Sequence, residues 1–484
     1  MANDRATFGV DLHLELRGGT LRTGLMDALR EAIRSGRLAE GVRLPSSRSL
    51  ATDLGVARNT VADAYAELVA EGWLTARQGS GTRVARRAVP RRPAGTGARP
   101  PGGARAAAAR PPTARPAYNL KPGVPDLASF PRAEWLKASR RALTAAPHEA
   151  FGYGDPRGRT ELRTVLADYL ARARGVYARP ERIVLCSGFA HGLMLVGQVL
   201  RARRVREVAV ESYGLGVHTD LLTGAGLRLA PLSFDERGTR TEELAAMKDV
   251  GAVLLTAAHQ FPLGGALNPG RRAAVVDWAR ASGGLVLEDD YDGEFRYDRQ
   301  PVGALQGLDP ERVVYMGTAS KSLAPGLRLA WMVLPEGLVD EVVAAKGAVD
   351  WMSSALEQLT FAEFLGSGAY DRHVRAMRLR YRRRRDQLVE AVAAHSPVTR
   401  VSGIAAGLHA VLELPPGTEP DVLRSAAWQG LALLGLDRFR HPSVAPALDG
   451  LVVGYATPPD SGWAGSLAAL CRVLPGRDIT DTPR

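Results

Sequence analysis

Cysteine and long apolar runs are scarce in this 484-residue chain, and each scarcity excludes a class of protein. The two cysteines, Cys186 and Cys471, cannot form a disulfide framework, which excludes a small disulfide-rich secreted protein. No run of 18 or more apolar residues occurs, so no membrane-spanning helix is expected. The N-terminus lacks the basic and then apolar order of a secretory signal peptide. We therefore expect a cytoplasmic protein with no membrane partner.

Lysine is also scarce, because only five of the 63 basic side chains are lysines. One of them, Lys321, follows Thr318 by three residues and precedes Arg328 by seven. A desolvated lysine can form a Schiff base, which an arginine cannot, and hydroxyl and guanidinium groups bind phosphate. The trio predicts a phosphorylated aldehyde joined to Lys321, with pyridoxal 5'-phosphate (PLP) as the candidate cofactor. A solvated loop lysine is the alternative, and Lys321 alone does not exclude it.

Positive charge is unevenly distributed along the chain. The net charge is +12, and residues 1–116 hold 19 arginines, no lysine and 10 acidic side chains, a local excess of +9. A basic N-terminal quarter indicates a polyanion as partner. A general preference for arginine over lysine is the alternative.

Composition divides the chain into a small N-terminal module and a large body. Residues 86–117 consist mostly of Pro, Gly, Ala and Arg, with almost nothing to bury, which is typical of an extended linker. We expect a first domain at 15–85 and a body at 118–475. Within the body, we expect a large subdomain at about 150–345 and a small one at about 346–475.

The N-terminal module has the pattern of three helices followed by two strands. Apolar residues at helical spacing predict a helix over residues 21–35. Serines suited to capping open a second helix at Pro45–Arg48, and Arg58 opens a third after a Gly turn. Two short strands are expected within residues 74–84, around a Gly-Ser-Gly turn. This order predicts a helix-turn-helix followed by a β-hairpin.

A helix-turn-helix of this kind predicts contacts with double-stranded DNA. The start of the third helix would face base edges or phosphates, and the start of the second would bind phosphate. The basic hairpin would enter a groove or follow the backbone. The residues expected to contact DNA are Ser46, Ser47, Arg48, Arg58, Asn59, Thr60, Arg77, Gly79, Ser80, Gly81 and Thr82. A helical docking domain with an arginine-rich surface is the alternative.

Three segments of the module resemble a known family of DNA-binding domains. They are Leu38–Arg48, Leu50–Val61 and Leu68–Thr75. Together they closely resemble the winged helix of GntR-type bacterial regulators, over about residues 20–85. The resemblance favours DNA binding over a docking role.

Short β-rich runs alternate with helical patterns in the body. This alternation predicts an α/β fold with a mostly parallel, doubly wound sheet. A long arginine-rich helix is expected at residues 371–395, and the strands and helices after it predict the smaller subdomain. The expected strands are Ile183–Leu185, Val208–Val210, Val253–Thr256, Leu285–Leu287 and Val313–Tyr315.

Two places in the body offer the remaining groups that PLP needs. The run Gly284–Asp292 is an apolar strand that ends in acids, at the kind of edge where doubly wound sheets bind ligands. Asp289 is expected at the ring nitrogen, and Tyr291, on the same side of an extended chain, at the ring hydroxyl. The phosphate is expected at a strand–helix junction, together with Thr318 and Arg328. The residues of this phosphate cup are Ser187, Gly188, Phe189 and Ala190. A charged loop and an ordinary strand–Gly–helix junction are the alternatives.

Residues 118–475 resemble fold type I aminotransferases. Tyr153-Gly-Asp-Pro-Arg-Gly158 resembles the family's Tyr-Gly-x-x-x-Gly segment, which implies that Tyr153 reaches the phosphate of the neighbouring subunit's cofactor. Thr256–Gly264 stands in the place of the Asn-Pro-x-x-Pro-x-Gly motif, which implies that His259 and Gln260 lie near the ring hydroxyl. A single histidine is more often structural, so the role of His259 rests on its place in this motif.

The order of the parts resembles the MocR family of transcriptional regulators over nearly the whole chain outside the linker. The resemblance rests on the GntR-type head, the Arg/Pro linker and a body that contains His-Gln-Phe-Pro and Glu-Asp-Asp-Tyr-Asp. It implies PLP bound as an internal aldimine at Lys321 and a head-to-tail homodimer. It also implies a response to an amine, an amino acid or PLP itself.

Two departures from the family pattern concern the ligand. Glu211–Leu215 replaces the family's Glu-Asp-Pro-Gly-Tyr, which leaves Tyr213 as the candidate aromatic against the cofactor ring. The strand at Leu451–Ala456 has no arginine to bind a substrate carboxylate, and Arg438 or Arg440 is the substitute to consider. Loss of this arginine would weaken the binding and the turnover of α-amino acids.

Three functions are compatible with these patterns. The first is a PLP-dependent transcriptional regulator that senses a ligand at Lys321. The second is an active PLP-dependent aminotransferase that carries a DNA-binding appendage, and the third is an interaction protein with a cofactor-free body as scaffold. The set of cofactor residues favours the first two, and the missing arginine favours the first over the second.

Overall fold

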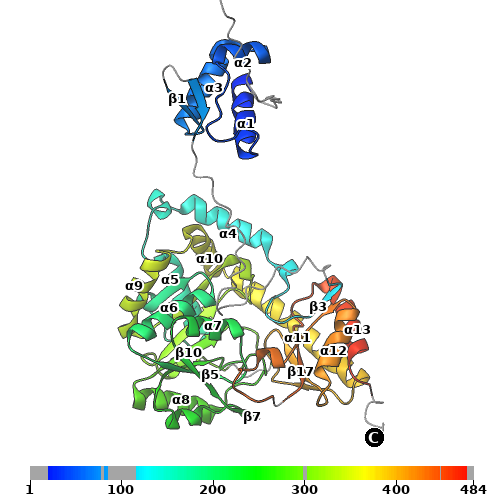
Figure 1. The fold of residues 1–484 in the computed structure, drawn as a ribbon. Coiled ribbons are helices and arrows are strands. Elements are labelled where there is room, and N and C mark those ends of the chain that lie inside the picture. Colours follow the sequence, from blue (N-terminus) through cyan, green and yellow to red (C-terminus); the bar gives the residue numbers. More distant parts are fainter. Residues whose placement is uncertain (1–19, 78–80, 86–115, 298–301, 447, 477–484) are drawn as a thin grey trace, which may run out of the picture. The chain divides into compact units, whose positions relative to one another are not determined.

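The computed structural model describes residues 20–77, 81–85, 116–297, 302–446 and 448–476. The chain forms two compact units, residues 1–111 and 112–484, and each is described by itself (Figure 1). Gly79, Ser80 and nearly all of the expected linker lie outside the described residues.

The N-terminal unit packs three helices against a two-stranded sheet. Its elements are α1 (Leu21–Arg34), α2 (Ser47–Leu54), α3 (Arg58–Ala70), β1 (Leu74–Arg77) and β2 (Gly81–Val84). Apolar residues at helical spacing face inward from all three helices, and Leu29, Val61 and Leu68 are fully buried among them. β1 and β2 pair antiparallel. The unit therefore has the helical core and the hairpin of a winged helix.

Local backbone chemistry sets the turn between α2 and α3. The Ser46 hydroxyl accepts a hydrogen bond from Ser49 N at 3.1 Å and caps α2. α2 ends at Gly55, whose φ of +65° is a conformation that glycine adopts without strain. Only Val56 and Ala57 separate Gly55 from α3. The short turn produces the expected helix-turn-helix.

A seven-stranded sheet forms the centre of the second unit. It consists of β4 (Ile183–Cys186), β5 (Glu207–Glu211), β6 (Arg228–Leu232), β9 (Val250–Leu255), β10 (Leu285–Asp290), β11 (Val313–Thr318) and β12 (Ala330–Val333). The order is β4-β12-β11-β10-β9-β5-β6. All neighbours are parallel except β12, which is antiparallel to β4 and β11. The predicted, mostly parallel sheet is confirmed.

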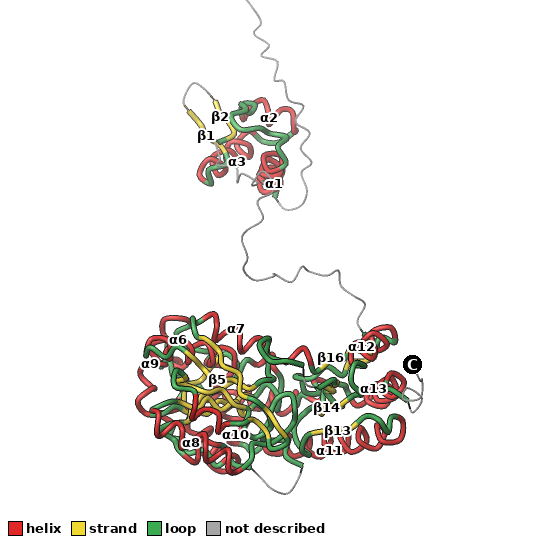
Figure 2. Tube along the Cα trace, turned by 60° about the horizontal axis from the view of Figure 1, so that its bottom comes forward, coloured by secondary structure: helices red, strands yellow, loops and turns green. Residues whose placement is uncertain are grey.

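Helices cover both faces of this sheet, as a doubly wound fold requires. α6 (Phe189–Ala202), α7 (Gly216–Gly224) and α9 (Val339–Val349) lie on one side, with α8 (Pro269–Ser282) and α10 (Ala355–Gly366) on the other (Figure 2). α5 (Thr160–Arg174) and α4 (Arg132–Ala145) pack beside α10. Each face has its own buried apolar clusters. The strands are therefore buried on both sides, which explains their nearly continuous apolar sequences.

A smaller subdomain follows in the sequence. Its antiparallel sheet has the order β13-β14-β17-β16, with bounds Arg400–Ser402, Ala410–Glu413, Gly450–Val453 and Leu434–Gly435. Its helices are α11 (Ala369–His395), α12 (Glu419–Trp428) and α13 (Asp460–Val473). β3 (Tyr118–Asn119) pairs in parallel with β15 (Leu431–Ala432), so the first described residues of this unit join the small subdomain.

One arginine of α11 anchors distant parts of the chain. Arg384 is only 2% exposed and lies 3.3 Å from Asp126 and 2.6 Å from Asp460. Its guanidinium also donates to Pro458 O at 2.7 Å. These bonds hold the segment before α4 and the start of α13 against the same helix. Although α11 is 27 residues long, no helix among the described residues combines the length and the apolarity needed to cross a membrane.

The predicted strands agree with the observed ones in place but not in extent. All five expected runs are strands, and each begins or ends within three residues of its predicted bounds. The sequence patterns do not predict β6 or β12. β6 contains Arg228 and Pro231, and it lies at the edge of the sheet, where proline is tolerated. β12 follows β11 with only a short 3-10 helix at Pro325–Leu327 between them, so it falls outside the alternation of strands and helices on which the prediction rests.

Candidate functional site

A cavity of about 630 Å³ lies at the carboxyl ends of the central strands. Four polar residues at the ends of neighbouring strands line it. Glu211 and Thr318 are the last residues of β5 and β11, Thr256 directly follows β9, and Asp289 is the last residue but one of β10. Residues 434 and 438–442 of the small subdomain line the cavity as well. Because the four strands are parallel, their polar end residues meet at one edge of the sheet.

Three consecutive acids end β10, and one of them has a carboxylate oxygen with no hydrogen-bond partner in the described part of the chain. Glu288 accepts two backbone hydrogen bonds, the shorter from Leu305 N at 2.7 Å. Asp290 forms a two-point pair with Arg174 at 2.6 and 3.0 Å. Asp289 points to the other face of the strand and lines the cavity, 6% exposed. Among the described residues, its Oδ1 has no hydrogen-bond partner.

The Asp289 Oδ1 atom, which has no hydrogen-bond partner among the described residues, indicates what a ligand in the cavity must offer. Burial raises the pKa of Asp289 well above its ordinary value, and the charge of Lys321 opposes this effect. A buried polar atom without a partner costs free energy, which a hydrogen-bond donor on a ligand would recover. A protonated ring nitrogen is such a donor.

Lys321 reaches the same cavity from the loop after β11. Its Nζ donates to Gly123 O at 2.6 Å. Burial lowers the pKa of Lys321, against the opposing charges of Asp289 and Asp292. A lowered pKa favours the neutral amine, which is the form that attacks a carbonyl carbon.

The junction at Ser187–Ala190 is the predicted cup for an anion, and Phe189 and Ala190 of this junction line the cavity. α6 begins at Phe189, so its first N–H groups lack acceptors within the helix. Gly188 has a φ of +92°, which glycine adopts without strain, and a Cβ there would lie 2.2 Å from Arg328 Nη2 and displace the guanidinium. Arg328 donates to Ser187 O. Thr318 and Arg328 also line the cavity, and this donor set suits a phosphate.

Tyr291 lines the cavity in front of a buried histidine–aspartate pair. Its Oη lies 3.1 Å from His259 Nδ1, and the same nitrogen lies 2.8 Å from Asp292 Oδ2. Burial, with the charges of Asp292 and Asp289, raises the pKa of Tyr291 well above its ordinary value, so its hydroxyl keeps its proton. The Gln260 side chain, by contrast, bonds to Phe261 O and Leu263 N of its own loop and to Tyr213 O, and it does not line the cavity.

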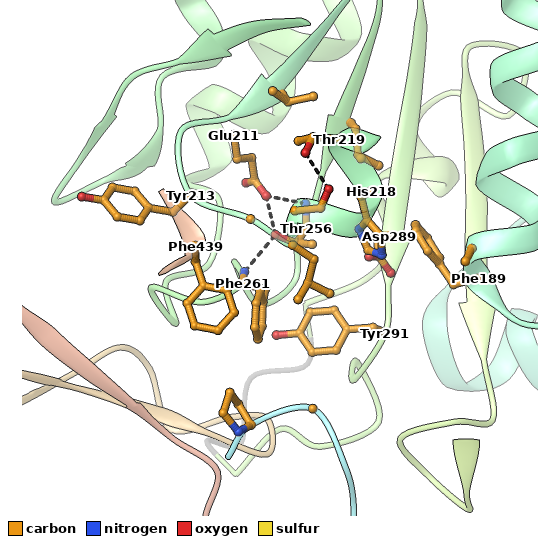
Figure 3. A pocket seen from close by; sticks show the side chains of 18 of the residues that line it. Phe189, Glu211, Tyr213, His218, Thr219, Thr256, Phe261, Asp289, Tyr291 and Phe439 are labelled. Carbon is orange, nitrogen blue, oxygen red and sulfur yellow. Dashed lines mark hydrogen bonds between the residues drawn. The ribbon is translucent and has the colours of Figure 1, made fainter. Parts of the chain in front are cut away.

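Tyr213 does not stand where a ring-stacking aromatic is expected. It lines the cavity but is only 4% exposed and belongs to an apolar cluster with Phe261 and Phe439. Figure 3 shows its hydroxyl turned away from Asp289. Leu215, which occupies the place of the family's tyrosine, lines the cavity with an aliphatic side chain. The stacking role of Tyr213 therefore stays a prediction without support from its orientation.

Sequence patterns did not single out several cavity residues, among them Glu211 and His218 (Figure 3). Glu211 accepts hydrogen bonds from Thr256 Oγ1 at 2.5 Å and Thr239 Oγ1 at 2.8 Å, and burial raises its pKa to about 7. The signal for Glu211 is an acid that closes an apolar strand, the same signal that points to Asp289. Burial and the Lys321 charge lower the pKa of His218 to about 4, which keeps its ring neutral.

Tyr153 lies outside this cavity. Its side chain is 93% exposed, and the next residue, Gly154, donates its N–H to Met352 Sδ at 3.2 Å. The backbone at Tyr153 is therefore held in place while its ring is open to another molecule.

The DNA-contact residues predicted on the N-terminal unit gather at two helix starts and at the hairpin. The first turn of α3 has no side-chain cap, and Thr60 N donates to Ala57 O at 3.0 Å, which leaves the N–H groups before Thr60 as the candidates to bind a phosphate. Ser46 is exposed, but its hydroxyl caps α2. Arg48, Arg58, Asn59, Arg77 and Gly81 are exposed, and Ser47, Thr60 and Thr82 are half-buried.

Two family models match the chain, one for each unit. The model described as "Bacterial regulatory proteins, gntR family" matches residues 21–84. The model described as "Aminotransferase class I and II" matches residues 117–430. The two matches coincide with the winged helix and with the sheet that carries the cavity.

Bacterial regulators match the chain over most of its length. It is 32% identical over 438 residues to the HTH-type pyridoxine biosynthesis transcriptional regulator PdxR of Corynebacterium glutamicum, covering 90% of this chain and 92% of that protein. It is 32% identical over 446 residues to the probable rhizopine catabolism regulatory protein MocR of Rhizobium meliloti, covering 89% of each. It is 34% identical over 399 residues to the HTH-type transcriptional regulator TauR of Rhodobacter capsulatus, covering 77% and 80%.

Solved aminotransferases share the fold of the second unit. LysN from Thermus thermophilus, an alpha-aminoadipate aminotransferase complexed with N-(5'-phosphopyridoxyl)-L-leucine, matches with a TM-score of 0.65 and 25% identity over 74% of this chain and 91% of that one. The Pyrococcus horikoshii kynurenine aminotransferase matches with a TM-score of 0.66 and 24% identity over 75% and 91%.

PLP is the cofactor that this fold family implies, and the cavity fits it. The unpartnered Asp289 Oδ1 offers an acceptor for the ring nitrogen, and the cup at Ser187–Ala190 offers donors for the phosphate. The PdxR and MocR regulators match both units of this chain over most of their own length. The chain therefore belongs to the MocR family of HTH-type transcriptional regulators, in which a GntR-type head is joined to an aminotransferase-like body.

Proposed function

We propose that this regulator holds PLP at Lys321 and senses an amine, an amino acid or PLP itself in the cavity. The observation that carries the proposal is the unpartnered Asp289 Oδ1, which shares a cavity with a lysine whose pKa is lowered by burial. Burying these two groups costs free energy, and a scaffold that binds no ligand would gain nothing in return. The body is thus a ligand sensor, and the GntR-type head binds double-stranded DNA in the cytoplasm.

Each group of the cofactor has a counterpart in the cavity. Lys321 is the nucleophile for the aldehyde carbon, Asp289 accepts from the ring nitrogen, and Tyr291 donates to the ring hydroxyl oxygen. Thr318, Arg328 and the Ser187–Ala190 cup bind the phosphate. When bound, PLP supplies a carbonyl that exchanges between amines and a ring that accepts electrons.

Arg438 is the side chain that we assign to the acidic group of an effector. It lines the cavity, and no hydrogen bond or ion pair is recorded for it among the described residues. Arg440 lines the cavity too, but Asp437 Oδ1 at 2.7 Å and Val444 O already accept its hydrogen bonds. Arg438 is therefore the better candidate to bind a carboxylate in place of the arginine missing from β17.

A homodimer with shared cofactor sites is part of the proposal. The 93% exposed ring of Tyr153 supports it, because a tyrosine in a Tyr-Gly segment with no place in its own cavity is available to a second copy. A head-to-tail arrangement would let each body influence the head of its partner. The effector changes DNA binding only if it has different affinities for the two states of the dimer.

An active aminotransferase is the second candidate, favoured by the complete set of lysine, aspartate and phosphate donors. The four residues of β17, Gly450–Val453, contain no arginine, which argues against efficient binding of α-amino acids. Steady turnover with an amino donor and a keto acid would establish this second function. A single half-reaction would not, because a sensor that exchanges amines also performs it.

Asp289→Asn is expected to separate cofactor affinity from protein stability. Because the pKa of Asp289 is raised above 3.8 in the fold, cofactor-free wild type loses stability as the pH rises from the unfolded pKa through the folded one. The asparagine variant escapes this loss, so at neutral pH it should unfold at the same temperature or higher. Its PLP affinity should fall by about tenfold or more, the loss expected for a hydrogen bond to a charged group.

Asp290→Asn is the matched control on the same strand. It breaks the buried pair with Arg174, so it should destabilise the cofactor-free protein by about 3–5 kcal/mol. Thermal unfolding with and without PLP, and spectroscopic PLP titration, measure both effects. Equal destabilisation by the two substitutions, or unchanged PLP affinity in Asp289→Asn, would contradict the assignment of Asp289.

Arg438→Ala should weaken amino acid effectors selectively. Loss of a two-point guanidinium–carboxylate contact predicts a decrease in affinity of roughly ten- to a hundredfold. Amines of the same length without an acidic group should bind the variant as they bind wild type. Titration of the visible absorbance of PLP-loaded protein measures both affinities. Equal losses for the two ligand classes would show that Arg438 acts on the fold and not on the carboxylate.

Arg58→Ala should weaken DNA binding while leaving the body unchanged. A base contact at α3 predicts a loss of about 1–3 kcal/mol, and a phosphate contact predicts a shallower dependence of affinity on salt. Arg22→Ala on α1 is the control, because Arg22 is half-exposed and only 3.7 Å from Glu67 in a weak surface pair. Binding to a genomic fragment selected with wild-type protein, measured at several salt concentrations, tests this. If Arg58→Ala matches Arg22→Ala, then α3 is not the recognition helix.

A further inference from the structure

Behind Tyr291 lies a buried pair that the cofactor assignment leaves without a role. The Asp292 and His259 side chains are 1% and 2% exposed, and Asp292 Oδ2 lies 2.8 Å from His259 Nδ1. Tyr291 Oη lies 3.1 Å from the same nitrogen. One ring nitrogen thus contacts a carboxylate and a phenol at once.

The short contact determines which way each hydrogen bond runs. A carboxylate oxygen 2.8 Å from Nδ1 requires a hydrogen on that nitrogen, because two lone pairs at this distance repel. With Asp292 ionised, His259 Nδ1 is therefore the donor. Tyr291 Oη can then only accept from Nδ1, and it cannot donate its own hydrogen there. The Tyr291 hydroxyl hydrogen can then go to the Asp292 carboxylate, with which Tyr291 also has a side-chain hydrogen bond, or to an acceptor in the cavity that Tyr291 lines.

The surrounding backbone is shaped around this pair. Gly407, before β14, has a φ of +74°, and a Cβ there would lie 2.2 Å from His259 Cε1 and 2.5 Å from Asp292 Oδ2. The Gly407 carbonyl in turn accepts a hydrogen bond from Tyr455 Oη at 2.7 Å. Segments far apart in the sequence thus enclose the pair. This indicates that the fold holds the two side chains in this arrangement and that their contact is not accidental.

A second histidine flanks the pair from the small subdomain. The His409 ring lies 5.1 Å from the ring of His259, and His409 Nε2 lies 3.0 Å from Pro262 O. Burial, together with His259, lowers the pKa of His409 to about 3, so the ring is neutral and donates from Nε2 to the carbonyl. His409 thus adds no charge that would compete with Asp292 for the His259 hydrogen.

We propose that Asp292 and His259 are positioning residues that hold Tyr291 as a one-way hydrogen-bond donor to the ring hydroxyl oxygen of the cofactor. The inference rests on the proposed binding of PLP and adds to it the two residues that orient the donor. The other charged or titratable groups that face Tyr291 are Asp289 and Glu211, and Lys321 lines the same cavity. A ligand acceptor competes with Asp292 for the tyrosine hydrogen, because Tyr291 Oη contacts both His259 Nδ1 and the Asp292 carboxyl.

The pH at which the bound cofactor changes colour reports on this donor. A hydrogen bond to an anionic ring oxygen stabilises the deprotonated form of the bound cofactor, so its loss raises the midpoint of the absorbance change. Tyr291→Phe should raise the midpoint by roughly one pH unit, the size expected for one hydrogen bond to a charged oxygen.

His259→Phe should do nearly the same, although Tyr291 is intact. The phenylalanine ring keeps the shape of the imidazole but donates nothing, so the Tyr291 hydroxyl can turn to Asp292 and leave the cavity. His259→Asn is the conservative control, because its amide nitrogen can take the place of Nδ1 and still donate to Asp292. It should restore the wild-type midpoint. The double variant Tyr291→Phe/His259→Phe should shift no further than Tyr291→Phe alone.

Four outcomes would overturn the proposal. In the first, His259→Phe leaves the midpoint unchanged while Tyr291→Phe moves it. In the second, His259→Asn shifts the midpoint as far as His259→Phe does, which would mean that the His259 ring acts by packing. If His259→Phe does not fold, Asp292→Asn decides, because an unchanged midpoint there contradicts the orienting role. The fourth outcome concerns a metal ion, because the ligand atoms of Asp292, His259 and His409 lie within 4.8 Å of one another. If metal analysis finds one ion per chain in wild type and none in His259→Phe, the three residues form a metal site. Absence of any PLP absorbance in wild type would instead refute the proposed function itself.

Discussion

The structure depends on which partners the three consecutive acids at the end of β10 have. The fold satisfies Glu288 with backbone N–H groups and Asp290 with Arg174, both deep in the interior. Between them, Asp289 faces the cavity with a carboxylate oxygen that no described residue contacts through a hydrogen bond. The alternation of side chains along a strand separates the structural acids from the functional one. A buried acid that the protein leaves unsatisfied makes the cavity selective for a ligand that carries a donor at that point.

The neighbouring elements follow from this one constraint. The parallel register of β5, β9, β10 and β11 brings their polar ends to the same edge, so Lys321, the phosphate cup and Tyr291 surround the place where Asp289 points. Burial then acts in opposite directions on the two key groups, since it raises the pKa of Asp289 and lowers that of Lys321. A cationic ring next to the acid and a carbonyl next to the amine relieve both penalties. In a regulator, the binding free energy gained in this way can shift the protein from one conformational state to another.

Much of this arrangement could be predicted from the sequence, because it depends on local patterns. The helix-turn-helix followed from Ser46, Gly55 and Arg58, and the core strands followed from apolar runs that end in acids or glycine. The patterns failed where tertiary contacts decide. β12 follows β11 without a full helix between them and so escapes the strand–helix alternation. The side chain of Gln260 bonds to its own loop and to Tyr213 O, which only the folded structure determines. Tyr213 was chosen by residue type, but packing against Phe261 and Phe439 orients it away from Asp289. Glu211 was overlooked although it closes a strand in the same way as Asp289.

We propose a coupling in which a ligand at Lys321 changes how the head binds DNA. Its most direct test compares wild type with Lys321→Ala, both passed through gel filtration with PLP and then titrated onto a selected DNA fragment with and without PLP or amine. Wild type should retain a visible absorbance distinct from free PLP, and its DNA affinity should change with ligand. Lys321→Ala should lose both properties and keep the DNA affinity of ligand-free wild type. Retention of the absorbance, or of the ligand response, by Lys321→Ala would contradict the account.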